Sequence, residues 1–171
     1  TMVAFSFFVI LMLYLWLNLS MMNPLQVGAH VPHFSGIDDQ GNPWSSADFK
    51  DKKLVVFFYP KASTPGCTAE ACSLRDHYSE LLAQGYALVG VSADSVKKQA
   101  KFKDTHQFPF PLLADEERKV IELFGVWGEK KFMGRTYDGI HRYTFVVENG
   151  AVIRVFDKVN TANHASQILE A

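Results

Sequence analysis

The chain has 171 residues, a formal net charge of −1 and only two cysteines. A single core of this size can fold without disulfide bonds, so a small scaffold built on disulfides is excluded. The near-zero net charge also argues against a protein that holds nucleic acid by bulk charge, and we expect no nucleic-acid partner.

The N-terminal residues differ from the rest of the chain. Every Asp, Glu, Lys and Arg lies beyond residue 37, and residues 3–19 form an apolar run interrupted only by Ser6 and Asn18. A run of this length just suffices to cross a bilayer. It lacks the basic residues and the cleavage site of a secretory signal. Three interpretations stay open: a membrane anchor, upstream sequence that is not native to the protein, and a buried core helix.

In all three interpretations the globular part begins near residue 22. We therefore divide the chain into a hydrophobic leader, residues 1–21, and one domain, residues 22–171. An internal methionine at this boundary can serve as the start of a cytoplasmic protein, which is the location that we expect. The alternative is a protein anchored in a membrane through residues 3–19.

From residue 22 onward, turn residues and apolar runs predict alternating strands and helices. Turn residues at 38–43 indicate an N-terminal hairpin, continuous apolar runs indicate buried strands, and helical spacing of apolar residues indicates helices. The expected strands are 54–59, 86–92, 141–147 and 151–156. The expected helices are a short turn that ends at Phe49, 67–84, a helix capped by Asp94 or Ser95 that ends near His106, 115–124, and a C-terminal helix capped by Asn160 or Thr161.

Two segments receive other assignments. Residues 108–113 are too rich in proline for a central strand. Residues 127–139, rich in Gly and Lys, are expected to be a loop. The order of elements predicts an α/β domain with a parallel portion followed by an antiparallel hairpin. We expect a thioredoxin-like fold, with a central mixed sheet flanked by helices and the N-terminal hairpin added to it.

The first cysteine stands where a helix is expected to begin. Cys67 follows Pro65 and Gly66 directly, after a buried strand and a short loop. The free N–H groups and the dipole of a helix start stabilise a thiolate, and they can also hold a peroxide oxygen. Thr64 can hydrogen-bond the sulfur or a substrate, and an arginine would complete such a site. The alternative is a small packing residue, because free cysteines are commonly buried.

The second cysteine, Cys72, lies five residues further along the same expected helix. Two helical positions five apart have Cα atoms about 8.6 Å apart, whereas disulfides need roughly 4.4 to 6.8 Å. If Cys67 and Cys72 form a redox pair, the start of the helix must therefore unwind. The alternative is again a packing cysteine. Neither the cysteines nor the six histidines show the spacing of a metal site, so we expect no metal and no cofactor.

Three stretches of the sequence resemble one enzyme family. The spacing Pro60-x3-Thr64-x2-Cys67 within FFYPKASTPGCTAEAC is similar to the signature of the peroxiredoxins, in particular the peroxiredoxin Q or bacterioferritin comigratory group. The strings FGVWGEK and MGRTYDGIHR, which end at Lys130 and Arg142, continue the likeness. The resemblance covers about residues 22–171 and implies a thioredoxin fold. It also implies a thiol peroxidase that reduces hydrogen peroxide and organic hydroperoxides.

The resemblance also implies roles for individual residues. Cys67 would be the peroxidatic nucleophile, which peroxide oxidises to a sulfenic acid. Thr64 and Arg142 would position the peroxide and activate the sulfur, while Pro60 shields the site. Cys72 would be the resolving cysteine of an intrachain Cys67–Cys72 disulfide, which thioredoxin or a similar dithiol reduces. We expect the protein to be a monomer.

Several alternatives remain beside this resemblance. By residue type alone, Arg142 can be a solvated charge at a strand edge, and Arg75 and Arg135 are weaker candidates for the same electrostatic role. A Sco-type copper chaperone tethered to a membrane also pairs an anchor with two nearby cysteines. That class has three residues between its cysteines, whereas four separate them here. A non-enzymatic thiol chaperone, with the cysteines as a redox switch, is the third hypothesis.

Overall fold

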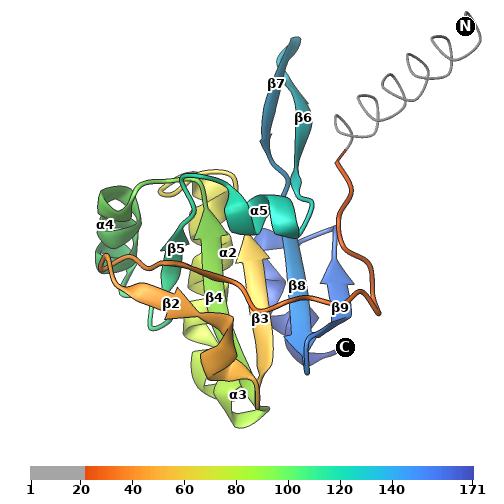
Figure 1. Ribbon diagram of the computed structural model, residues 1–171. Helices are drawn as coiled ribbons and strands as arrows, with labels where there is room; N and C mark the ends of the chain where they lie inside the picture. Colours follow the sequence, from red (N-terminus) through yellow and green to blue (C-terminus); the bar gives the residue numbers. More distant parts are fainter. Residues whose placement is uncertain (1–21) are drawn as a thin grey trace, which may run out of the picture.

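The computed structural model describes residues 22–171, so the interpretations of the hydrophobic leader lie outside the described residues (Figure 1). Its centre is a five-stranded mixed sheet with the strand order β5-β4-β3-β8-β9. The three strands β3, β4 and β5 are parallel, while β8 runs antiparallel to β3 and β9 antiparallel to β8. These strands are β3 (Lys53–Phe58), β4 (Tyr86–Ser92), β5 (Leu112–Ala114), β8 (Tyr143–Glu148) and β9 (Ala151–Phe156).

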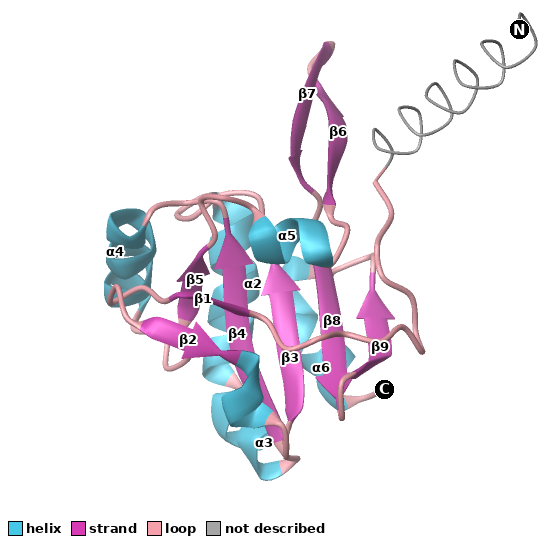
Figure 2. Cartoon of the chain, viewed as in Figure 1, coloured by secondary structure: helices cyan, strands magenta, loops and turns pink. Residues whose placement is uncertain are grey.

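Helices cover both faces of this sheet (Figure 2). Alternate residues of β3 explain this, because Val55 and Phe57 belong to one buried cluster while Leu54, Val56 and Phe58 belong to the other. The first cluster includes residues of four helices: α2 (Pro65–Asp76), α3 (Tyr78–Ala83), α4 (Val96–His106) and α6 (His164–Leu169). The second includes α5 (Lys119–Leu123) and the N-terminal hairpin of β1 (Ser35–Ile37) and β2 (Pro43–Ser45). Burial on both faces is why the central strands read as continuous apolar runs.

The α/β fold and most of the expected elements are confirmed. The expected hairpin forms from β1 and β2, and Ser45 caps the 3-10 turn Ser46–Phe49 through its hydroxyl. Ser95, not Asp94, is the N-cap of α4, with its hydroxyl accepting from the amide of Lys98. A further 3-10 turn, Thr161–Asn163, precedes α6. The proline-rich segment ends in β5, which lies at the edge of the sheet and not at its centre.

The single helix expected over 67–84 is wrong. Two helices, α2 and α3, meet at His77, whose φ of −111° and ψ of 17° interrupt the helical backbone. The His77 ring nitrogen Nδ1 lies 3.0 Å from the carbonyl oxygen of Ser73, which gives one of the last carbonyls of α2 a partner. The helix also begins two residues early, because proline is favoured at the first helical position.

The loop expected over 127–139 is also wrong. Strands β6 (Trp127–Phe132) and β7 (Arg135–Ile140) pair in register and form a hairpin that projects from the body of the domain (Figure 1). Its two turn residues, Met133 and Gly134, have φ values of 48° and 77°, as a tight hairpin turn requires. Most of its side chains are exposed, so the strands carry no apolar alternation that marks them in the sequence.

The helix expected over 115–124 is shorter than its prediction. It occupies only Lys119–Leu123, because Arg118 adopts a left-handed φ of 60° just before it. The carboxylate of Asp115 accepts a hydrogen bond from the amide of Ile121 and supports this short helix from the preceding turn. Among residues 22–171, no helix has both the length and the apolar character needed to cross a bilayer.

Gly90 generates a prediction about the core. A Cβ at this position of β4 would lie 2.7 Å from atoms of both Phe57 and Leu112, whose side chains are fully buried. Gly90→Ala should therefore lower the free energy of unfolding by about 1–3 kcal/mol through overpacking. Urea denaturation measures this change. Gly36→Ala is the control, since its nearest neighbour lies at 3.4 Å, and equal losses in the two variants would contradict the packing argument.

Candidate active site

Cys67 lies in the first turn of α2, next to the end of the central strand β3. Thr64 is the N-cap residue with an extended backbone, Pro65 is the first helical residue and Cys67 the third. The Cys67 side chain is buried, with a relative exposure of 2%. Amides in the first turn of a helix have no partner within the helix, so the turn that carries Cys67 has partial positive charge.

Arg142 is brought to this cysteine from a distant part of the chain. It directly precedes β8, and its Nη2 donates to the Sγ atom of Cys67 at 3.3 Å across a sequence separation of 75 residues. A Cβ at Gly66 would lie 3.3 Å from the same nitrogen, so the guanidinium packs closely over the first turn of α2. Of the arginines considered from the sequence, this one therefore supplies the positive charge beside the thiol.

The base of the projecting hairpin supports the two residues that precede Arg142. Lys130 donates from Nζ to the carbonyl oxygen of Ile140 at 2.9 Å, and the backbone amide of His141 donates to Val126 at 2.8 Å. Burial lowers the pKa of Lys130, and the nearby charge of Arg142 lowers it further. The missed hairpin therefore helps to fix the position of the arginine.

Glu70 is a site residue that the sequence did not reveal. It is fully buried, and its Oε2 accepts from Nη1 of Arg142. Burial raises the pKa of Glu70 to about 7, despite the opposing effect of Arg142. Its position three residues after Cys67 places both on one face of α2. That spacing was the available signal, but a lone glutamate in the second turn of a helix is ordinarily solvated.

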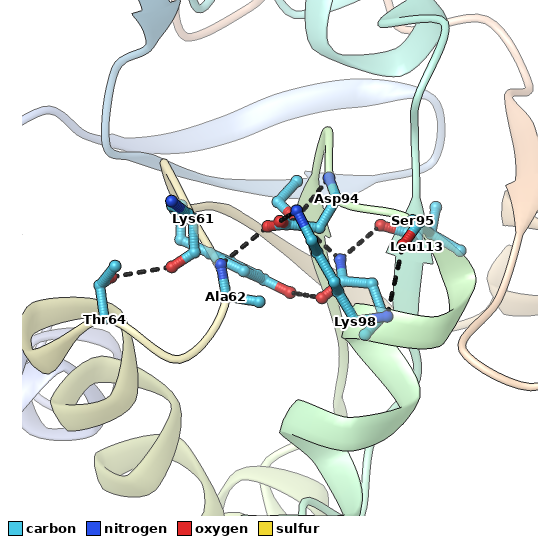
Figure 3. A network of polar contacts seen from close by, with 10 residues as sticks. Lys61, Ala62, Thr64, Asp94, Ser95, Lys98 and Leu113 are labelled. Carbon is cyan, nitrogen blue, oxygen red and sulfur yellow. Dashed lines mark hydrogen bonds and ion pairs between the residues drawn. The ribbon is translucent and has the colours of Figure 1, made fainter.

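The loop before Cys67 is fixed by a buried polar network (Figure 3). The backbone amide of Ala62 donates to Oδ2 of Asp94 at 2.7 Å, and the hydroxyl of Ser92 donates to the same oxygen at 2.9 Å. Asp94 is only 8% exposed. Because Asp94 follows β4, the sheet holds the loop that leads to the cysteine.

The same network continues under the site through Gln99. The hydroxyl of Tyr59, the last buried residue before Pro60, donates to Oε1 of Gln99 at 2.5 Å. The amide of Gln99 donates in turn to Ser92 and to the carbonyl of Leu113. Burial raises the pKa of Tyr59 well above its usual value, so this phenol stays protonated and serves as a hydrogen-bond donor.

Thr64 does not bond the sulfur in this structure. Its hydroxyl donates to the carbonyl oxygen of Lys61 at 2.8 Å, which closes the loop (Figure 3). The lone pairs of Oγ1 remain able to accept a hydrogen bond from a bound ligand. Pro60 is half-buried at the point where the chain leaves β3.

The other residues considered from the sequence lie further from the thiol of Cys67. Cys72 is a partly exposed free thiol in the middle of α2, and burial raises its pKa while Arg75 opposes the rise. Arg75 itself pairs with Asp76 and donates to the carbonyl of His106 at 2.7 Å. Arg135 stands at the exposed tip of the hairpin. Within residues 22–171, no group of three His, Cys, Asp or Glu side chains is placed to hold a metal ion.

A buried histidine lies behind this site. His164, in the first turn of α6, is fully buried, and its Nε2 lies 3.8 Å from the carboxylate of Glu70. Burial lowers its pKa to about 4, so the ring is neutral at pH 7. No signal in the sequence distinguishes the buried His164 from the other five histidines.

Comparisons with known proteins agree with this geometry. Residues 27–156 match the model of the AhpC/TSA family. The chain is 49% identical over 150 residues to a putative peroxiredoxin Bcp of Haemophilus influenzae, covering 87% of this chain and 97% of the relative. It is 46% identical over 149 residues to peroxiredoxin Bcp of Escherichia coli, covering 86% of this chain and 96% of the relative. A structure of the Xanthomonas campestris bacterioferritin comigratory protein superposes with a TM-score of 0.75 at 33% identity, covering 80% of this chain and 88% of the other.

Glu70 and His164 predict opposite effects of pH on stability. Folding raises the pKa of Glu70 from 4.5 to about 7, so the stability from its protonated form is lost as the pH rises through this window. Folding lowers the pKa of His164 from 6.5 to about 4, so the stability that its neutral form contributes is gained as the pH rises from 4 to 6.5. Glu70→Gln removes the first effect and leaves the second.

The free energy of unfolding of Glu70→Gln, relative to the unmodified protein, should therefore increase by about 2–3 kcal/mol between pH 4.5 and 7. Urea denaturation of both proteins at several pH values gives this difference. The constant loss of the pairing with Arg142 shifts the two curves apart but does not change their relative slope. Parallel curves over this range would show that the carboxyl does not take up a proton in the folded state.

Proposed function

Since the chain belongs to the AhpC/TSA family and is a peroxiredoxin, a thiol-dependent peroxidase, we propose that Cys67 is the cysteine that peroxide oxidises. The observation that carries this assignment is the contact of Arg142 Nη2 with Cys67 Sγ at 3.3 Å, in the first turn of a helix. A cation and a helix start together favour the thiolate, which is the nucleophilic form of cysteine. Cys72 lacks this combination, because it lies in mid-helix and burial raises its pKa even though Arg75 opposes the rise.

In the first step, the thiolate of Cys67 attacks one oxygen of the peroxide. A sulfur–oxygen bond forms, the O–O bond breaks, and the leaving oxygen departs as water or an alcohol after it takes up a proton. The sulfur is thereby oxidised to a sulfenic acid and the peroxide is reduced. Arg142 stabilises the negative charge that develops on the leaving oxygen, Thr64 accepts from the peroxide O–H, and Pro60 shields the sulfur from solvent.

In the second step, Cys72 resolves the sulfenic acid. Its thiolate attacks the Cys67 sulfur, an S–S bond forms, and the S–O bond breaks to release water after protonation. Both cysteines belong to one continuous helix, α2, in which their Cα atoms are about 8.6 Å apart. Since a disulfide needs a shorter distance, the first turns of α2 unwind before this bond forms. Thioredoxin or a similar dithiol then reduces the disulfide by exchange.

The proposed substrates are hydrogen peroxide and organic hydroperoxides. The Xanthomonas campestris relative is described for alkyl peroxide reduction, which supports the organic part of this range. Sulfur supplies both electrons, so turnover needs no metal and no organic cofactor. We further propose that residues 22–171 act as a monomer in the cytoplasm, with anchoring through residues 3–19 as the alternative location.

The two cysteine assignments predict different defects. Cys67→Ser should abolish peroxide-dependent NADPH consumption in an assay with thioredoxin and thioredoxin reductase, because the nucleophile is lost. Cys72→Ser should consume about one equivalent of peroxide and then turn over at least about tenfold more slowly. Full activity of Cys67→Ser would overturn the assignment. Copper uptake by the unmodified protein, without peroxidase activity, would favour a copper chaperone instead.

The anchoring of the active-site loop predicts a third defect. Asp94→Ala removes the acceptor of the Ala62 amide, and the displaced loop should lower kcat/KM for peroxide by about tenfold or more, since small displacements of reacting groups are costly. Lys98→Ala is the control, because this exposed lysine lies 3.8 Å from the same carboxylate and such pairs contribute little. It should change kcat/KM by less than about twofold. A similar loss in both variants, or none in Asp94→Ala, would contradict the anchoring role.

A further inference from the structure

The helix that carries both cysteines is tied to α6 by a buried hydrogen bond. The Ser73 hydroxyl oxygen accepts from the backbone amide of Ala165 at 3.1 Å, and both residues are buried. Ala165 is the second residue of α6, where amides lack a partner within the helix, and the N-cap residue Asn163 supplies none from its side chain. Ser73 therefore caps α6 from a neighbouring helix.

The start of α6 is itself fixed by a second buried contact. His164 Nε2 lies 2.8 Å from the hydroxyl oxygen of Thr144 in β8, and its Nδ1 lies 2.9 Å from Oε1 of Gln167. Since Oε1 is an acceptor, the neutral ring carries its proton on Nδ1 and accepts from Thr144 at Nε2. His164 and Thr144 are both fully buried.

The other end of α6 is also fixed. Arg154 in β9 donates to the carbonyl oxygens of Ile168 and Gln167 at 2.8 and 3.0 Å. The sheet therefore holds α6 at both ends, independently of α2. If these two helices separate, α2 is the one that moves.

Formation of the proposed disulfide requires α2 to unwind between Cys67 and Cys72, up to the residue that contacts α6. Cys72 must approach Cys67, and Ser73 is its immediate neighbour in the chain. We propose that Ser73 is a positioning residue that sets the rate at which Cys72 reaches oxidised Cys67. Thr144 and His164 act with it, because they fix the start of α6, which Ser73 contacts. The proposal rests on the function assigned above to the two cysteines.

The rate of unwinding decides between two fates of the sulfenic acid. Attack by Cys72 forms the disulfide and releases water. Attack by the sulfenate on a second peroxide forms a sulfinic acid, with the peroxide reduced to water or an alcohol. A contact that holds α2 wound therefore slows the first reaction and increases the share of the second at high peroxide concentration.

The test follows both reactions by rapid acid quench and intact-mass spectrometry after mixing with hydrogen peroxide. Ser73→Ala should form the Cys67–Cys72 disulfide about threefold to tenfold faster than the unmodified protein, as expected for one buried hydrogen bond. It should also accumulate less sulfinic acid, while the rate of the first oxidation stays the same. Thr144→Val should also speed disulfide formation and reduce sulfinic acid. It serves as the second variant if Ser73→Ala folds poorly.

Asp39→Ala is the matched control for a general loss of stability. Asp39 is 3% exposed, accepts from the amide of Leu112 at 2.9 Å and pairs with Lys103, on elements other than α2 and α6. Unchanged disulfide formation in both Ser73→Ala and Thr144→Val, or equal acceleration in Asp39→Ala at the same free energy of unfolding, overturns the inference. If the unmodified protein forms no Cys67–Cys72 disulfide, the resolving role of Cys72 itself is wrong, and the inference fails with it.

Discussion

The site depends on one contact, between the guanidinium of Arg142 and the first turns of α2. Arg142 donates one nitrogen to the thiol of Cys67 and another to the buried carboxylate of Glu70. The sheet register makes this contact possible, since Phe58 at the end of β3 pairs with Tyr143. The antiparallel pairing of β3 with β8 therefore brings Arg142 to the edge where the loop towards Cys67 begins. A slip of one residue would turn the side chains of β8 to the opposite faces.

The same helix must satisfy two incompatible demands. As the proposed nucleophile, Cys67 needs the wound first turn, because free amides and the helix dipole stabilise a thiolate there. The proposed disulfide needs that turn unwound, because Cys72 lies too far along the helix. Two buried polar side chains of α2 stabilise the wound form: Glu70 pairs with Arg142, and Ser73 accepts a hydrogen bond from α6. Buried polar groups lose their partners when a helix moves, so these contacts favour the reactive conformation over the resolving one.

The sequence predicted those parts that local patterns encode. The strands 86–92 and 151–156 and the helix ending near His106 follow from apolar runs and caps. The surroundings of Cys67 called for an arginine, and the family resemblance of the string that ends at Arg142 identified it. The role of Glu70 was not predicted, because its burial depends on an arginine 72 residues away. The hairpin of β6 and β7 was not predicted because only its base packs on the core, through Trp127 and Ile140, while most of its other side chains are exposed. The break at His77 was not predicted, because the helical spacing of apolar residues continues across it although the helical backbone does not.

The most direct test of the central claim is amide hydrogen exchange of the unmodified protein, reduced and after one equivalent of hydrogen peroxide. The account predicts a Cys67–Cys72 disulfide in the oxidised sample, together with lost protection in residues 67–73. The amides of β3 and β4 should keep their protection, because the sheet does not take part in the change. A Cys67–Cys72 bond with α2 protected as in the reduced protein would contradict the account.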